Sequence, residues 1–201
     1  FLPTVHANSD DKLHIITVAE WSDAMILESN GHYAMIDTGE DFSYPDGSNP
    51  RYPDREGITK DKDKITQDRL FAHIKQLGIK SFDFIIITHA HSDHVGSAHD
   101  VLKTIPTKKL YIKKYSDDRI TDKTGLWDNL YGYERALQAA LETNTTIVQD
   151  ISEKDSHLML GDIKIDLLNY ENEYESDGSL KKVYDDNLNS ILAIVNINNT
   201  K

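Results

Sequence analysis

Three histidines and one aspartate stand within seven positions, in the segment THAHSDH at residues 88–94. The segment directly follows the apolar run FIII, so it lies at the end of a predicted strand. Because side chains alternate along an extended chain, His89 and His91 are predicted to project to one face, with Ala90 on the other. Two imidazoles on one face are suited to bind one metal ion.

The next two ligand-type residues are predicted to serve a second ion. Asp93 and His94 follow Ser92, a predicted cap where the chain turns into a helix. The loop then suits two ions about 3.5–4 Å apart, as in other two-metal hydrolytic sites. Imidazole and carboxylate ligands without sulfur favour zinc over manganese or iron. The alternative is a histidine-rich surface loop, which four ligand-type residues at these offsets do not favour.

The strand that must position this loop is FDFIIIT at residues 82–88. Its continuous apolar run is typical of a strand covered on both faces. A helix is predicted before it at about 64–77, because apolar residues recur on one face and Gly78 follows as a stop signal. The polar loop at about 40–62 is long for a connector, and loops of this size are typically functional or mobile.

The remaining chain contains short strand-forming segments and further helices. Asn30 and Gly31 predict a tight hairpin, since both turn residues must take positive φ. Strands on both sides of helices, with one strand fully buried, predict a layered α/β architecture. The other predicted strand-forming segments are 12–20, 23–29, 108–115, 145–151, 157–170 and 189–197, and the other predicted helices are 97–105 and 126–142.

The bulk composition sets limits on the function. The 201 residues carry a formal net charge of −12 and include no cysteine. A chain of this length fits one domain with a substantial core. The negative charge argues against nucleic acid as the main partner, because phosphates would be repelled. The absence of cysteine excludes thiolate ligands and a cysteine nucleophile. No apolar run approaches the roughly 20 residues of a membrane-spanning helix. The oligomeric state stays open.

Both ends of the chain carry signals of processing or truncation. Residues 1–7 are interpreted as a signal-peptide remnant, because VHA before Asn8 resembles the small-residue end of such a peptide. An arbitrary starting point is the alternative. In SILAIVNINNTK a predicted strand is followed by turn residues without a returning partner, which would leave an apolar edge. Residues 8–201 are therefore interpreted as one domain truncated at its C-terminus.

The segment THAHSDHVG resembles the signature of the metallo-β-lactamase superfamily, and MIDTG at residues 35–39 resembles an earlier motif of that family. The resemblance implies an αββα sandwich with the metals at one edge of the sheets, of which this chain would hold the N-terminal part. Asp37 would then support the metal loop through hydrogen bonds; a plain strand-end turn is the alternative. The implied zinc ligands are His89, His91, Asp93 and His94.

Longer stretches resemble the catalytic domains of teichoic acid phosphorylcholine esterases, which are choline-binding surface proteins of Gram-positive bacteria. The likeness runs from about residue 11 to the last residue and implies a secreted or surface-attached protein. The stretches are SDAMILESNGHYAMIDTGED, NPRYPDREGI, LKTIPTKKLYIKKYSDDRIT, LWDNLYGY and YDDNLNS.

The resemblance also implies ligands that this chain does not contain. The superfamily needs a later aspartate that bridges both metals and at least one further histidine, and the likeness places both beyond Lys201. Asp185, Asp186 and His157 could be taken as replacements. A helix cap and a strand-start histidine are the favoured interpretations of these residues.

The implied reaction is zinc-dependent hydrolysis of a phosphodiester, which releases phosphorylcholine from cell-wall teichoic or lipoteichoic acid. A water that bridges two zinc ions has its pKa lowered from about 15.7 towards 7, so hydroxide is available at neutral pH. Asp93 is the candidate catalytic residue. Whether this chain is active alone stays open.

Choline requires a pocket of its own, because a quaternary ammonium cannot donate a hydrogen bond. Aromatic faces bind such a group at roughly 0.5–2 kcal/mol each. Trp127 and Tyr131 are spaced i and i+4, and ordinary core residues are the equally favoured alternative. The candidates are Trp127, Tyr131 and Tyr133, with Tyr115 and Asp117 upstream.

Other functions share the metal motif. A β-lactamase, a glyoxalase-like thioesterase and a nuclease associated with DNA uptake belong to the same superfamily. The negative charge disfavours the nuclease, and the esterase-like stretches disfavour the other two. A cell-wall binding module with a vestigial metal site is the alternative from a different class.

Overall fold

The structure is a computed structural model that describes residues 11–19, 22–41, 43–54 and 65–197. The predicted signal-peptide remnant and the second half of the polar loop at 40–62 lie outside the described residues. No helix in the described ranges is both long enough and apolar enough to cross a membrane.

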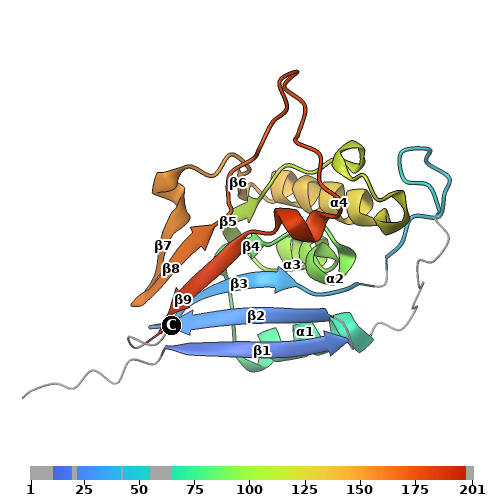
Figure 1. Ribbon diagram of the computed structural model, residues 1–201. Helices are drawn as coiled ribbons and strands as arrows, with labels where there is room; N and C mark the ends of the chain where they lie inside the picture. The colour runs from blue at the N-terminus through green and yellow to red at the C-terminus, as the bar shows by residue number, and fades with distance from the viewer. Residues whose placement is uncertain (1–10, 20–21, 42, 55–64, 198–201) are drawn as a thin grey trace, which may run out of the picture.

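A six-stranded mixed sheet forms the centre of the molecule (Figure 1). Its first three strands are antiparallel, and the remaining strands run parallel. Asn30 and Gly31 turn the chain with φ of 50° and 78°, which confirms the predicted hairpin. In spatial order the strands are β1 (Lys12–Ala19), β2 (Ser22–Ser29), β3 (His32–Thr38), β4 (Phe82–Ile87), β5 (Thr107–Ile112) and β6 (Thr146–Val148).

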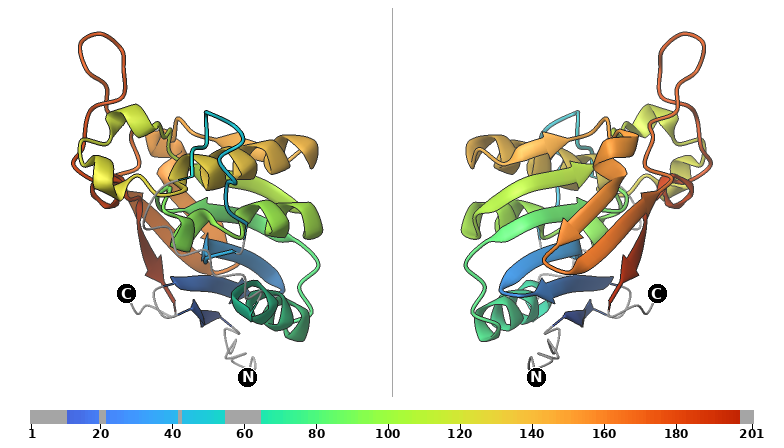
Figure 2. Two further views of the ribbon diagram at one scale, coloured as in Figure 1. Left: turned by 90° about the vertical axis from the view of Figure 1, so that its right-hand side faces the viewer. Right: turned by 90° about the vertical axis from the view of Figure 1, so that its left-hand side faces the viewer.

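A three-stranded antiparallel sheet packs on one face of the first sheet (Figure 2). Its strands are β7 (His157–Leu160), β8 (Ile163–Leu168) and β9 (Leu192–Asn196). The predicted segment 157–170 forms two strands because Gly161, with φ of 54°, turns the chain between them. Alternate residues of β8, namely Ile163, Ile165 and Leu167, are buried between the sheets.

Helices cover the opposite face of the six-stranded sheet. The described α-helices are α1 (Ile65–Gln76), α2 (Ser92–Val95), α3 (Ala98–Thr104) and α4 (Asn129–Glu142). Gly78 ends α1 with φ of 69°, as predicted. The predicted helix at 126–142 begins later, because Leu126 has non-helical angles after the 3-10 turn η2 (Lys123–Gly125).

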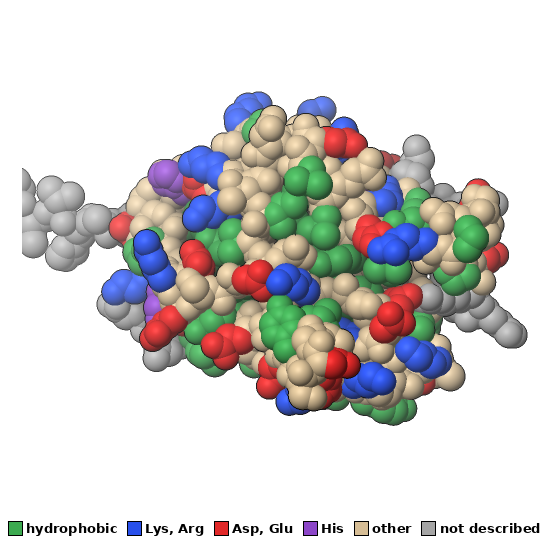
Figure 3. Space-filling model, turned by 90° about the horizontal axis from the view of Figure 1, so that it is seen from above, with side chains coloured by type: hydrophobic (Ala, Val, Ile, Leu, Met, Phe, Trp, Pro, Cys, Tyr) green, Lys and Arg blue, Asp and Glu red, His purple; other side chains and the backbone are tan. Residues whose placement is uncertain are grey.

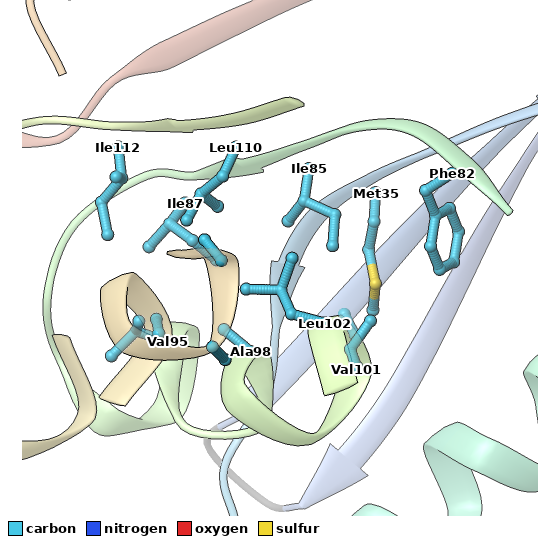
Figure 4. Close-up of a cluster of buried hydrophobic side chains, with 14 of the residues drawn as sticks. Met35, Phe82, Ile85, Ile87, Val95, Ala98, Val101, Leu102, Leu110 and Ile112 are labelled. Carbon is cyan, nitrogen blue, oxygen red and sulfur yellow. The ribbon is translucent and has the colours of Figure 1, made fainter. Parts of the chain in front are cut away.

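The strand β4 separates two apolar cores, as its sequence predicts. Ile85 and Ile87 face the helices, where they meet Leu102 and other side chains shown in Figure 4. Phe84 and Ile86 face the second sheet. The described residues therefore form a helix layer, a central sheet and a second sheet. This arrangement confirms the predicted α/β fold of the metallo-β-lactamase type.

The segment between β8 and β9 returns to the end of β4. It first forms a protruding hairpin, residues 173–181, visible at the top of Figures 1 and 2. Val183 N then donates to Arg119 O of η1 (Asp117–Arg119) at 2.9 Å. The 3-10 turn η4 (Asp186–Asn189) follows, and Ile191 N donates to Thr88 O at 2.9 Å. A distant part of the chain thus lies against the histidine loop.

Candidate metal centre

The first predicted ligand pair meets at the end of β4. His89 Nε2 lies 3.1 Å from His91 Nδ1, and the two ring centroids are 4.6 Å apart. Both residues are buried, with 6% and 5% of their surface exposed. Ala90, between them, instead donates its N–H to Asp186 Oδ2 at 2.8 Å. The Ala90 side chain is buried in the helix-side core, whereas the two rings meet each other, so the predicted alternation along this loop is confirmed.

The second predicted pair lies beside the first. His94 Nε2 is 3.5 Å from Asp93 Oδ2, and the His94 ring centroid is 4.0 Å from that of His89. Both residues belong to α2, whose first turn follows His91 directly. The loop therefore brings all four predicted ligands together.

The outward nitrogen of each imidazole faces a hydrogen-bonding or acidic group. His94 Nδ1 lies 2.7 Å from Asp37 Oδ2, and His89 Nδ1 lies 3.1 Å from the Thr88 hydroxyl. His91 Nε2 is 3.5 Å from the nearest carboxylate, that of Asp185, and has no hydrogen bond. In metal sites, groups behind a ligating histidine fix its tautomer and ring orientation. Here they orient the rings of His89 and His94, whereas no hydrogen bond holds His91 Nε2.

Asp37 links two of these imidazoles. Its backbone takes φ of 54°, which an aspartate tolerates better than most residues. Its Oδ1 accepts the Thr88 N–H at 2.7 Å, and its Oδ2 accepts both the Thr88 hydroxyl at 2.8 Å and His94 Nδ1. The buried carboxylate therefore joins the end of β3 to Thr88 and His94 of the histidine loop.

Each of the two donor pairs has the spacing of two ligands in a tetrahedral zinc site. Zinc–nitrogen bonds of 2.0–2.1 Å at a tetrahedral angle place two donors about 3.3 Å apart, close to both observed separations. Burial, with smaller contributions from the charges of His94 and His91, lowers the pKa of His89 to about 2, so its ring is the neutral form that a ligand requires. Within the described ranges, no three His, Asp or Glu side chains already surround one metal position. Each pair would thus supply two of the four positions that zinc needs.

Polar residues outside the motif hold the loop in place. Ser22 Oγ donates to Asp93 O at 2.9 Å, and Ser92 Oγ donates to Glu40 Oε2 at 2.9 Å. The prediction that Ser92 caps α2 is wrong: His91 occupies the cap position, and the Ser92 hydroxyl is engaged with Glu40. Burial, followed by the charge of Asp128, raises the pKa of Glu40 to about 8.

The three residues considered as replacement ligands have structural roles. Asp185 accepts from Asn187 N at 2.9 Å and caps η4. The buried Asp186 holds Ala90 N–H, a role that sequence reasoning missed, and burial raises its pKa. His157 begins β7 and lies 2.7 Å from Asp166 on the exposed face of the second sheet.

The aromatic candidates separate into two groups. Trp127 is 44% exposed, and its ring lies 5.7 Å from that of His91. It lines a hollow with the half-buried Tyr131 and with Tyr52, a residue that sequence reasoning missed. Tyr115 and Tyr133 are instead buried in the helix-side core, 5.7 Å apart. The structure does not bring these two to the hollow.

The hydroxyls of the two buried tyrosines are engaged. Tyr115 donates to Asp117 Oδ1 at 2.9 Å and accepts from Asn129 Nδ2 at 3.2 Å. Tyr133 accepts a hydrogen bond from Gln149. Burial raises the pKa of Tyr133 to about 12.

Comparisons with known proteins address the family. A sequence model described as the metallo-beta-lactamase superfamily matches residues 22–161. None of the curated proteins matches the chain. Solved structures include ST1585 of Sulfolobus tokodaii, an archaeal metallo-beta-lactamase superfamily protein, at 15% identity and a TM-score of 0.44; the match covers 91% of this chain and 59% of that one.

Two further solved structures are similar to this chain. The metallo-beta-lactamase family protein TTHA1429 of Thermus thermophilus is 13% identical with a TM-score of 0.43, over 85% of this chain and 54% of its own. The metallo-beta-lactamase GOB-18 of Elizabethkingia meningoseptica is 20% identical with a TM-score of 0.38, and the match covers 81% of this chain and 51% of that one. The chain thus spans between about half and three fifths of the length of these proteins.

Proposed function

Because the chain belongs to the metallo-β-lactamase superfamily, whose members are generally metal-dependent hydrolases, we propose that it is a zinc-dependent phosphodiester hydrolase. The proposed substrate is the phosphorylcholine ester of teichoic or lipoteichoic acid, and the proposed location is the surface of a Gram-positive cell or its surroundings. His89 and His91 would hold one ion, and Asp93 and His94 a second.

The observation that carries the proposal is the pair of donor sets on one loop beside an exposed aromatic ring. When bound, zinc supplies Lewis-acid charge neutralisation and makes a water-derived nucleophile available near neutral pH. The chain itself contributes position: Asp37 and Thr88 hold the imidazoles of His89 and His94, and Asp186 holds the backbone between the first two ligands.

The hollow beside His91 supports a choline-bearing substrate. Trp127, Tyr52 and Tyr131 line it, and Tyr52 meets Tyr131 edge-on with centroids 5.4 Å apart. The Arg135 guanidinium covers the ring of Tyr131 at 5.1 Å, and Trp127 is the most exposed ring of the three at 44%, so Trp127 would contribute most to binding a quaternary ammonium. The hollow has room for about one water, so choline entry would need the 43–54 loop to shift.

The face of the molecule that is seen from above carries side chains of both charges. Figure 3 shows acidic and basic side chains interspersed over this face, with apolar side chains exposed between them. Among the described residues drawn there, the basic groups form no continuous surface. Nucleic-acid sites gather Lys and Arg on one face or stripe.

A chromogenic phosphorylcholine ester tests the proposal in the presence of zinc, on this chain and on any longer form of the protein. We expect Trp127→Ala to lower kcat/KM about 2- to 30-fold, which corresponds to one cation–aromatic contact. Tyr174→Ala, an exposed aromatic on the protruding hairpin, is the matched control and should have no effect. Hydrolysis of a β-lactam but not of the ester would show that the substrate is wrong. Zinc binding without any turnover would favour the wall-binding module.

A further inference from the structure

Two buried cations lie close together without a carboxylate partner. Lys113 follows β5 and is 5% exposed, and Arg119 ends η1 and is 2% exposed. Lys113 Nζ donates to Asn169 O at 2.9 Å, and Arg119 Nη1 donates to Lys114 O at 3.3 Å. Neither forms an ion pair with a carboxylate in the described part of the chain. Buried charges are normally paired, so this pair requires an explanation.

Among the described residues, Asp186 is the only buried carboxylate near these two cations, and it already accepts a hydrogen bond. Asp186 interacts electrostatically with both Lys113 and Arg119, but its Oδ2 accepts the Ala90 N–H of the metal loop. Glu171 and Glu173 also act on Lys113, but they are exposed, so the two buried cations share only one buried carboxylate and keep a surplus of positive charge behind that loop. The side chain of Arg119 has five N–H donors and uses one, while its buried Nε has no partner.

A hollow of about 290 Å³ opens beside Arg119. It lies between η1 and the 173–181 hairpin, and the parallel bridge between Ile120 and Val183 holds these walls together. Lys182 adds a second cation, and Asp118 is the one carboxylate in the lining. The lining residues are Ser116, Asp118, Arg119, Ser179, Leu180 and Lys182.

We propose that this hollow binds a phosphate-type oxyanion, anchored by Arg119 and Lys182. A guanidinium matches the geometry of phosphate through two parallel N–H bonds, and a lysine adds a point charge. The anion would neutralise the buried surplus that Asp186 leaves uncompensated. The site is separate from the zinc ligands, and the inference does not rest on the proposed hydrolase activity. The anion can be free phosphate or a phosphate group within a polymer.

The test is a calorimetric titration of inorganic phosphate into protein freed of metal with EDTA, with chloride at the same ionic strength as the reference. Removing metal ensures that any phosphate bound does not occupy a zinc site. Arg119→Gln should weaken phosphate binding at least 10-fold, and Lys182→Gln about 3- to 10-fold. Lys181→Gln is the matched control, since this exposed neighbour pairs with Glu173 and does not line the hollow.

The absence of any phosphate binding, or equal affinity in the two hollow variants and the wild type, would overturn the proposal. Should Arg119→Gln fail to fold, Lys182→Glu reverses a charge at the rim without touching the core and should still cost at least 10-fold. Undiminished binding in that variant would refute the site. A choline-free poly(glycerol phosphate) identifies the source: tighter binding than phosphate, lost in the same variants, indicates a polymer, and equal binding indicates free phosphate.

Discussion

Replacing Asp37 by asparagine should weaken zinc binding through the tautomers of two histidines. The native carboxylate can only accept hydrogen bonds, so His94 Nδ1 and the Thr88 hydroxyl both donate to Oδ2. The Thr88 oxygen then accepts from His89 Nδ1. Both imidazoles therefore carry their proton on Nδ1 and keep the Nε2 lone pair for a metal.

The amide of the Asp37→Asn variant reverses this chain of hydrogen bonds. If its oxygen keeps the Thr88 N–H, its NH₂ group faces Thr88 Oγ1 and His94 Nδ1, and both must become acceptors. His94 then carries its proton on Nε2, and the Thr88 hydroxyl turns to donate to His89 with the same consequence. Asparagine tolerates the positive φ of this position, so the fold should persist with a loss of about 1–2 kcal/mol.

The expected loss of zinc affinity is about 10- to 100-fold, or roughly 1.4–2.7 kcal/mol, as for other groups behind a metal-ligating histidine. Calorimetric zinc titration measures it, and ¹⁵N NMR of the imidazoles reports the tautomers. Asp83→Asn is the matched control, because Asp83 also lies 2.7 Å from a histidine Nδ1, that of His32, on β3 away from the loop. A folded Asp37→Asn protein with zinc affinity within twofold of the wild type would refute the reasoning.

Three further changes test the support of the loop. Asp186→Ala leaves the buried Ala90 N–H unpaired and removes the buried carboxylate that acts on Lys113 and Arg119. It should therefore cost at least about 1–3 kcal/mol in urea denaturation, whereas the exposed Glu171→Gln should stay within about 0.5 kcal/mol. Burial raises the pKa of Glu40 from 4.5 to about 8, so between these pH values the folded state holds a proton that the unfolded chain releases. The free energy of unfolding should therefore fall as the pH rises from 4.5 to 8. Denaturation curves recorded at these two pH values should show no such fall for Glu40→Gln. Gly96→Ala would place a Cβ 2.5 Å from a backbone oxygen of α2, so it should lower both the melting temperature and the zinc affinity; unchanged values would contradict the packing.

The sequence is sufficient to predict the arrangement of the ligand loop, because the directions of its side chains depend on residues that are neighbours along the chain. Alternation after a buried strand is sufficient to place His89 and His91 on one side. The carboxylate of Asp186 could not be assigned in this way, since it reaches Ala90 only because the segment before β9 returns to the end of β4. No periodicity in that segment indicates its path.

The aromatic residues show the same limit. Tyr131 and Tyr133 are close in sequence, but α4 turns them to different sides, one toward the hollow and one into the core. Tyr52 joins Trp127 from a loop far along the chain, and its part in the hollow depends on contacts with α4 that sequence spacing does not encode.

Zinc titration of the metal-free chain tests the metal centre most directly, with the four residues His89, His91, Asp93 and His94 replaced by alanine in a second sample. The wild-type chain should bind at least one zinc ion per molecule, and the substituted chain should bind none. A wild-type chain that binds no zinc, or a substituted chain that binds it equally well, would contradict the assignment of these side chains as ligands.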